Sequence, residues 1–323
     1  MRAWRVAAVA VLAGAFAVPA TAVGSDGGRQ VFSFRDPRIT ESSGLVDLGS
    51  MMVTTNDSGD SSRVFVVDPA SGRTVGITDY HSEMLDAEAL APAGPGEVWV
   101  GDIGDNSRSR DEVTVYRVPV GERQIDVASP VRYRFTYPDG SHDAESLLVD
   151  RAGRIYLISK SPLGGTVYRA PATLSRSGRN RLTAVAEVAD FATDAALGRG
   201  DRFVVVRGPA QASVYTFPGF RRVGTFALPH QHQKKKISIG PDGRVRISSE
   251  KAGTAVEQVD LPAGILRGLR HPATTPAGPP PEPEPAAAGH DGNRGTTLLA
   301  WSVAGVLVLG AVGLGLGLRR GSA

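Results

Sequence analysis

Short apolar runs, rather than long amphipathic ones, make up the middle of the chain. Between Val31 and Leu269, runs rich in Val, Ile, Tyr and Phe recur between clusters of Gly, Pro, Asp and Ser. No stretch of this segment keeps a helical period, and runs of this length between turn residues are typical of β-strands. The pattern therefore predicts an all-β domain over residues 31–269.

The apolar runs repeat in three registers. The first register is a polar box that leads into a strand: Glu41–Leu45, Asp86–Leu90, Asp143–Leu147, Thr193–Leu197 and Gln233–Ile237. The second is an apolar strand ending in a polar turn, and its members begin at Met51, Glu97, Arg154, Arg202 and Arg244. The third holds Phe65, Tyr116, Tyr168 and Tyr215, with Val256 as a weaker fifth member. Five units that keep the same order of registers indicate a repeat architecture.

A fourth strand is expected after each of the first four units, at residues 74–80, 131–137, 183–188 and 223–228. The fifth unit lacks such a strand, whereas Val31–Phe34 precedes the first box without a unit of its own. A first strand that completes the last sheet closes a ring of four-stranded sheets and leaves few exposed edges. We therefore predict a five-bladed β-propeller, with a six-bladed propeller, a β-sandwich or a less regular barrel as the alternatives.

The two ends of the chain predict export and membrane attachment. Residues 1–22 combine a positive start, an apolar run and a small-x-small cleavage pattern, which indicates a signal peptide. Residues 296–318 are apolar and uncharged, would span about 35 Å as a helix, and precede two arginines that place the tail in the cytoplasm. The expected organisation is a signal peptide (1–22), a short N-terminal segment (23–30), the propeller (31–269), a Pro-rich disordered stalk (270–295), a transmembrane helix (296–318) and a cytoplasmic tail (319–323).

Charge and cysteine content narrow the function classes. The formal net charge is only +3, and basic and acidic residues are interspersed, so no basic face indicates nucleic-acid binding. The chain contains no cysteine, which excludes disulfides and thiolate metal sites. The expected partners are the membrane, through the single C-terminal span, and an unknown surface ligand or protein.

Candidate chemistry gathers at one end of the predicted channel. In an antiparallel sheet the start of one strand and the end of the next lie at the same end, so the boxes and the polar strand ends converge on one mouth. The boxes contribute Glu41, Asp86, Glu88, Asp143, Glu145 and Asp194. The second strands contribute Asn56, Asp57, Asp102, Asp105, Lys160, Arg207 and Glu250. These side chains are the candidate ligand-binding residues.

Two interpretations of the mouth carboxylates remain open. Carboxylates in one concave opening repel each other unless they are protonated or bridged by a cation, and hard oxygen ligands favour Ca²⁺. Alternatively, Asp and Glu at a repeated position cap turns and accept backbone hydrogen bonds from the neighbouring blade. His142, beside Asp143, and Glu145 are the candidates for acid-base chemistry.

A resemblance to known propellers rests on the stretches ESSGL, TTNDSGD, DAEAL, VWVGDIGDN, VYRVP and HDAESL. Together they resemble secreted β-propeller proteins of actinobacteria described as WD-repeat-like or esterase-like phytase-type, over residues 39–262. At greater distance the chain is similar to the gluconolactonase and paraoxonase superfamily, in which Glu, Asn and Asp hold a catalytic Ca²⁺. This resemblance implies those metal-binding roles for Glu41, Asn56 and Asp102. The chain departs from that superfamily in having five units rather than six, and its fourth and fifth boxes carry Ala195 and Lys235 in place of glutamate.

Two functions follow from the sequence. The stalk, the anchor and the absence of GxSxG, HExxH and P-loop motifs favour a ligand- or protein-binding module at the cell surface rather than an enzyme. The alternative is a calcium-dependent hydrolase of ester, lactone or phosphoester substrates, in which the metal polarises the substrate and a mouth residue acts as the base.

Overall fold

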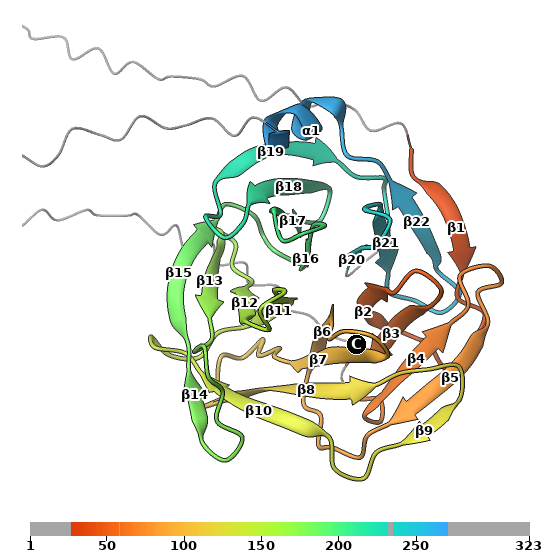
Figure 1. The fold of residues 1–323 in the computed structure, drawn as a ribbon, viewed down its shortest axis with the longest axis vertical. Coiled ribbons are helices and arrows are strands. Elements are labelled where there is room, and N and C mark those ends of the chain that lie inside the picture. Colours follow the sequence, from red (N-terminus) through yellow and green to blue (C-terminus); the bar gives the residue numbers. More distant parts are fainter. Residues whose placement is uncertain (1–26, 58, 232–234, 271–323) are drawn as a thin grey trace, which may run out of the picture. The chain divides into compact units, whose positions relative to one another are not determined.

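The described part of the chain is a ring of five antiparallel sheets around a central axis (Figure 1). The structure is a computed structural model, and it describes residues 27–57, 59–231 and 235–270. The all-β, five-bladed propeller predicted from the repeats is therefore confirmed, and the six-bladed ring and the sandwich are excluded. The ring closes because the innermost strand of each sheet packs against those of its two neighbours.

The first three blades are built in chain order from the innermost strand outwards. Blade 1 contains β2 (Ser42–Asp47), β3 (Met52–Asn56), β4 (Arg63–Val67) and β5 (Thr74–Asp79). Blade 2 contains β6 (Ala87–Pro92), β7 (Glu97–Asp102), β8 (Val113–Pro119) and β10 (Val131–Thr136). Blade 3 contains β11 (Ala144–Val149), β12 (Ile155–Ser159), β13 (Gly165–Arg169) and β15 (Thr183–Val188).

The last two blades show how the ring closes. Blade 4 contains β16 (Asp194–Leu197), β17 (Phe203–Arg207), β18 (Gln211–Thr216) and β19 (Arg222–Ala227). Blade 5 contains β20 (Lys235–Ile239), β21 (Val245–Ser249) and β22 (Ala255–Val259), and its outer strand is β1 (Arg29–Ser33) from the start of the chain. The pairing of β1 with β22 confirms the predicted closure by the N-terminal strand.

Three peripheral elements were not predicted. The short strands β9 (Gln124–Asp126) and β14 (Arg179–Arg181) add in parallel to the outer edges of blades 1 and 2. Three-residue strands of mostly polar residues carry no apolar period, so the sequence pattern does not reveal them. The helix α1 (Ala263–Arg270) packs Ile265 against blade 4, where a Cβ on Gly224 would lie 3.2 Å from the Ile265 side chain.

The hydrophobic core is divided into five clusters that lie between or beside neighbouring blades. The cluster between blades 1 and 2, for example, joins Val53 and Val66 to Val98 and Val118. Because a blade is covered by another blade on each face, its second strand is buried along its length, as in β3 and β12. This double burial explains why those strands read as continuous apolar runs rather than as alternating ones.

Among the described residues, no helix is both long and apolar enough to cross a membrane. The predicted signal peptide (1–22), the stalk (270–295) and the predicted transmembrane segment (296–318) lie outside the described residues, apart from Arg270 at the end of α1. In the part of the chain that the structure describes, the strands and the five core clusters lie within residues 27–270. The contacts between innermost strands that close the ring lie in this segment.

Candidate functional site

The start of each innermost strand pairs with the end of the second strand of the same blade. Ala87 pairs with Asp102 in blade 2, and Asp194 pairs with Arg207 in blade 4. The residues expected at the mouth are thus brought to one end of each blade by the antiparallel ladder. Most of them are buried, including Asn56, Asp57, Glu88, Asp102, Asp105, Asp143, Glu145, Asp194, Arg207 and Glu250.

Three of the innermost strands carry an irregularity at the mouth. The ladder register shifts between Ser42 and Gly44 in β2, between Ala87 and Ala89 in β6, and between Ala144 and Ser146 in β11. An extra residue in a strand leaves the ladder and redirects its side chain. The extra residues are Ser43, Glu88 and Glu145, and Ser43 Oγ donates a hydrogen bond of 3.0 Å to Glu88 Oε2.

Lys236 joins the two bulged glutamates. Its ammonium nitrogen Nζ lies 3.1 Å from Glu88 Oε2, 3.2 Å from Glu145 Oε2 and 2.7 Å from the Glu88 carbonyl oxygen, and its side chain is fully buried. Burial alone would lower the pKa of Lys236, but the attraction of Glu88, Glu145 and Asp194 outweighs it and raises the pKa above its usual range. Lys236 is therefore charged in the folded protein.

Lys160 supplies a second positive charge to the same group. Its Nζ lies 3.1 Å from Asp143 Oδ2 and also contacts Glu145 Oε1. Burial opposes ionisation of Glu145, but Lys236 and Lys160 overcome this effect and lower the pKa of Glu145. We call Ser43, Glu88, Glu145, Lys160 and Lys236 the mouth plug. It supplies from the chain itself the cations that bridge neighbouring carboxylates.

Asp194 and Arg207 are two further buried ionisable side chains beside the plug, and they pair through their backbones. Asp194 Oδ2 accepts a hydrogen bond of 2.8 Å from the Ile237 amide, and Arg207 Nη1 donates one of 3.1 Å to the Ser248 carbonyl. Complete burial raises the pKa of Asp194 from 3.8 to about 7, and it lowers the pKa of Arg207 to about 9. These two groups link β16 and β17 to the strands of blade 5.

The raised pKa of Asp194 predicts a pH-dependent stability. Between pH 3.8 and about pH 7 the folded state holds a proton that the unfolded state has released, so this contribution is present at low pH and is lost as the pH rises. We expect the parent protein to lose stability relative to Asp194→Asn as the pH rises from 4 to 7. The difference in the free energy of unfolding should change by up to roughly 4 kcal/mol, and the difference in melting temperature should fall with it. Melts of the parent, Asp194→Asn and the exposed control Asp111→Asn would check this, and a difference that stays constant with pH would contradict it.

Glu41, Asn56 and Asp102 are the residues to which the resemblance assigns a metal-binding role. Two of them, Asn56 and Asp102, hold the loops that lead into the innermost strands. Asn56 Oδ1 accepts hydrogen bonds from the amides of Thr40 and Glu41, at 3.1 and 3.2 Å. Asp102 Oδ1 accepts the Asp86 amide at 2.9 Å and also pairs with Arg110 Nη1 at 2.9 Å. The third member, Glu41, is exposed.

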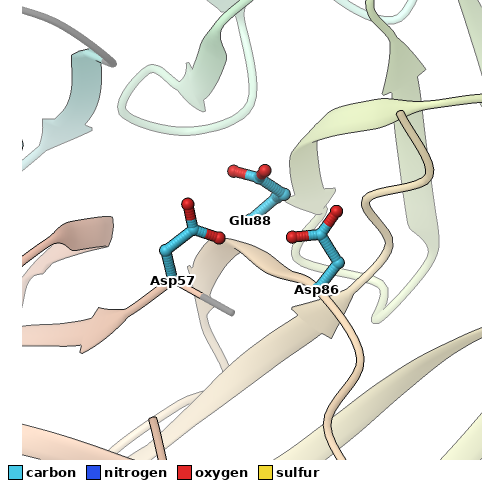
Figure 2. A group of neighbouring side chains, drawn as sticks. All are labelled: Asp57, Asp86 and Glu88. Carbon is cyan, nitrogen blue, oxygen red and sulfur yellow. The ribbon is translucent and has the colours of Figure 1, made fainter. Parts of the chain in front are cut away.

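A different group of carboxylates has the spacing that a cation needs. One oxygen each of Asp57, Asp86 and Glu88 lies within 4.8 Å of the other two, and Figure 2 shows the three side chains turned towards one another. Asp57 follows β3, Asp86 precedes β6, and Glu88 is the bulged residue of β6. Gly104 leaves the space for this arrangement, because a Cβ there would lie 2.4 Å from Asp86 Oδ2.

His142 lies in an aromatic cluster rather than among the mouth carboxylates. Its Nε2 is 2.9 Å from the Tyr168 hydroxyl and 3.0 Å from Asp139 Oδ1. The imidazole also makes an edge contact with Tyr137, at 5.0 Å between ring centroids. Asp143, the next residue, accepts a hydrogen bond of 2.9 Å from the Asp105 amide. Asp143 therefore joins the loop that leads to β11 to the loop that follows β7.

A second hollow, a cavity, lies at the opposite end of the channel. It measures about 950 Å³ and is lined by the far ends of the innermost strands and by the turns that follow them. The sequence analysis missed this cavity, because the residues that line it are ordinary apolar and glycine-rich turn residues. It also missed Lys236 and Ser43, since the boxes were aligned without the bulges that only the first three blades contain.

Comparison with known proteins finds similar solved structures but no family. No protein-family description and no curated protein matches the chain. Solved structures similar to it include a gluconolactonase from Xanthomonas campestris (13% identity, 76% of this chain and 97% of that chain, TM-score 0.45). The PQQ-bound aldose sugar dehydrogenase from Streptomyces coelicolor has 12% identity and a TM-score of 0.44, over 72% of this chain and 96% of that chain. Virginiamycin B lyase from Staphylococcus aureus has 12% identity and a TM-score of 0.38, over 72% of this chain and 73% of that chain. The chain is thus distantly similar to gluconolactonase-type propellers, as the sequence predicted, and the likeness concerns the fold alone.

Proposed function

We propose that this chain is a membrane-anchored extracellular β-propeller that acts as a ligand- or protein-binding module at the cell surface. The predicted signal peptide, stalk and C-terminal apolar segment support its display outside the membrane. A closed ring of blades supports a binding role because it holds the loops at both of its ends on rigid strands.

The observation that carries this proposal is the difference between the two ends of the channel. At the mouth, Lys160 and Lys236 form ion pairs with Asp143, Glu145 and Glu88. At the other end, a cavity of about 950 Å³ is available, and small-molecule sites measure about 300–1,000 Å³. The cavity, rather than the acidic mouth, is therefore the ligand site that we favour.

The second candidate function is a calcium-dependent hydrolase. It is supported by the grouping of Asp57, Asp86 and Glu88, whose three carboxylates fit a Ca²⁺ ion in ligand type and in spacing. Bound there, Ca²⁺ would polarise a substrate oxygen. Lys236 opposes this ion, because its charge lies 3.1 Å from Glu88 Oε2.

The candidate bases also favour binding over hydrolysis. The lysines beside Glu145 lower its pKa, and a carboxylate of low pKa is a poor general base near neutral pH. The imidazole of His142 is engaged by Tyr168 and Asp139. Glu145 is therefore a poor candidate base, and His142 is held in an aromatic cluster apart from the mouth carboxylates.

Calcium binding and turnover separate the two functions. On residues 27–270 we expect calorimetry to record no saturable Ca²⁺ binding at micromolar concentrations, and we expect no turnover of ester, lactone or phosphoester substrates in calcium. The melting temperature should be the same in calcium and in chelator, because a ligand stabilises only the state that it binds.

The variants Asp57→Asn and Asp86→Asn, with the exposed Glu122→Gln as the matched control, identify the site of any calcium effect. Micromolar binding that is lost in the first two variants and kept in the third, together with calcium-dependent turnover, would replace the binding module with the hydrolase.

A further inference from the structure

The cavity at the turn end of the channel has an apolar inner part. Each blade contributes at least one buried apolar side chain to its lining, among them Leu45, Leu90, Leu147, Ala195 and Ile237. These residues follow the mouth plug directly along the innermost strands, since Leu90 is two residues beyond Glu88 and Ile237 is next to Lys236. The plug therefore closes the inner end of the cavity, and a ligand enters from the turns.

The depth of the cavity suits a medium-length alkyl chain. Leu147 lies four residues before the turn residue Arg151, a distance of roughly 13 Å at the rise of an extended strand. An extended chain of about ten carbons has a similar length, at roughly 1.3 Å per carbon. Half-buried apolar residues, Val149, Leu197 and Ile239, continue the lining towards the opening.

Two arginines lie on neighbouring turns at the opening. Arg151, in the turn of blade 3, and Arg199, in the turn of blade 4, are exposed and line the cavity. The Arg151 amide donates a hydrogen bond of 2.6 Å to Asp201 Oδ2, and a Cβ on Gly200 would lie 4.0 Å from Arg151 Nη1. Within the described residues, neither guanidinium forms an ion pair with a carboxylate.

The other charged groups of the lining already have partners. Asp150 Oδ1 accepts the amides of Ala152 and Arg154, at 2.9 and 2.8 Å. Asp47 faces Arg246 at 3.7 Å. Arg117 pairs with Glu97 at 2.5 Å. Asp150 and Asp201, which also line the cavity, are held by backbone amides, whereas no ion pair among the described residues holds either arginine. An anionic group at the opening would pair with both guanidinium groups.

We propose that this cavity binds a free single-chain anionic amphiphile, with its alkyl chain among the apolar lining and its acidic head between Arg151 and Arg199. The inference rests on the binding function proposed above and names the ligand class of that cavity. A carboxylate, sulfate or phosphate head would serve, because a guanidinium binds each of these through two parallel hydrogen bonds.

Decanoate, below the concentration at which it forms micelles, is the probe, and decanol is its neutral match. Calorimetry on residues 27–270 should give saturable binding of decanoate, with affinity at least tenfold higher than for decanol. Trp99 lines the cavity and is the only tryptophan in this segment, so its emission should change with occupancy. The double variant Arg151→Gln/Arg199→Gln should lose roughly tenfold or more in affinity for decanoate, but not for decanol.

Two further variants locate the site. Arg202→Gln removes an exposed arginine that does not line the cavity, and it should bind decanoate as the parent does. Val149→Phe places a larger side chain in the cavity wall, so it should weaken the binding of both decanoate and decanol. Circular dichroism of each variant checks that the propeller is intact.

The outcomes separate this inference from the proposed function. Equal affinity for decanoate and decanol, unchanged in the arginine variant, would overturn the anionic class and leave a binding module for neutral ligands. Binding to anionic vesicles without binding of monomeric decanoate would overturn the free amphiphile in favour of a lipid surface. No binding of either probe to a folded parent would overturn the cavity as an amphiphile site, whereas calcium-dependent turnover would overturn the binding module itself.

Discussion

Replacing Lys236 by methionine should lower the free energy of unfolding by about 3–5 kcal/mol, because it leaves Glu88 and Glu145 buried without their shared cation. The two carboxyl groups are almost fully inaccessible to water, so solvent cannot take over the role of the ammonium group. In a domain of this size the melting temperature should fall by roughly 6–20 °C. Urea and thermal unfolding of residues 27–270 would measure the change.

Compensating variants test whether charge, rather than packing, explains the loss. The variant Lys236→Met combined with Glu88→Gln and Glu145→Gln should recover most of the stability, since it removes the two buried carboxylates together with their shared cation. Lys160 keeps its ion pair with Asp143 in this variant. Lys251→Met, at an exposed site, is the matched control and should change stability by less than about 0.5 kcal/mol. A loss below about 1 kcal/mol for Lys236→Met would show that the mouth plug does not hold the ring together.

The second large effect concerns the closing strand. Phe32→Ala in β1 should cost about 3–5 kcal/mol, the usual range for a buried phenylalanine. Phe32 pairs with Val256 of β22 and meets Phe34 edge to face, at 5.4 Å between ring centroids. Its loss weakens the contact that joins the first strand of the chain to the last blade. Unfolding in urea would measure the change.

The control for this prediction is Gln30→Ala, an exposed residue of the same strand, which should be nearly neutral. If the two variants were equally stable, closure by β1 would contribute little to the fold. If both were strongly destabilised, the backbone pairing rather than the Phe32 side chain would carry the closure.

The two ends of the channel have different physical characters, and this difference bears on function. One end is filled by buried ions whose removal is costly, so it is suited to holding the ring in one register. The other end is apolar and open and is bordered by two arginines that form no ion pair among the described residues. A ligand with an apolar part and an anionic group could bury the first and pair the second with an arginine at that end.

Most of the fold could be predicted because the repeat is local. The apolar runs ending in polar turns mark the second strands, and the tyrosines Tyr116, Tyr168 and Tyr215 mark the third strands, all within single stretches of chain. The unpaired run near Phe32 could be matched to the incomplete fifth unit by counting strands. What counting could not reveal were β9 and β14, which are too short and too polar to carry a period.

The site was only partly predictable. The sequence identified the mouth residues, since the antiparallel ladder places box and turn at one end of each blade. It could not tell which carboxylates would cap loops, as Asp102 does, and which would form ion pairs, as Glu145 does. That choice depends on distances of a few ångströms between blades that are far apart in the chain.

The sequence by itself determined the number of blades, the order of their strands and the closure by the first strand, because these depend on periodicity and turn residues along one chain. Only the tertiary structure decided the chemistry of the channel. Bulges in β2, β6 and β11 bring Ser43, Glu88 and Glu145 together, whereas β20 lacks a bulge and brings Lys236 between the two glutamates. A register shift of one residue decides which side chain faces its neighbours, and it is set by packing across the ring.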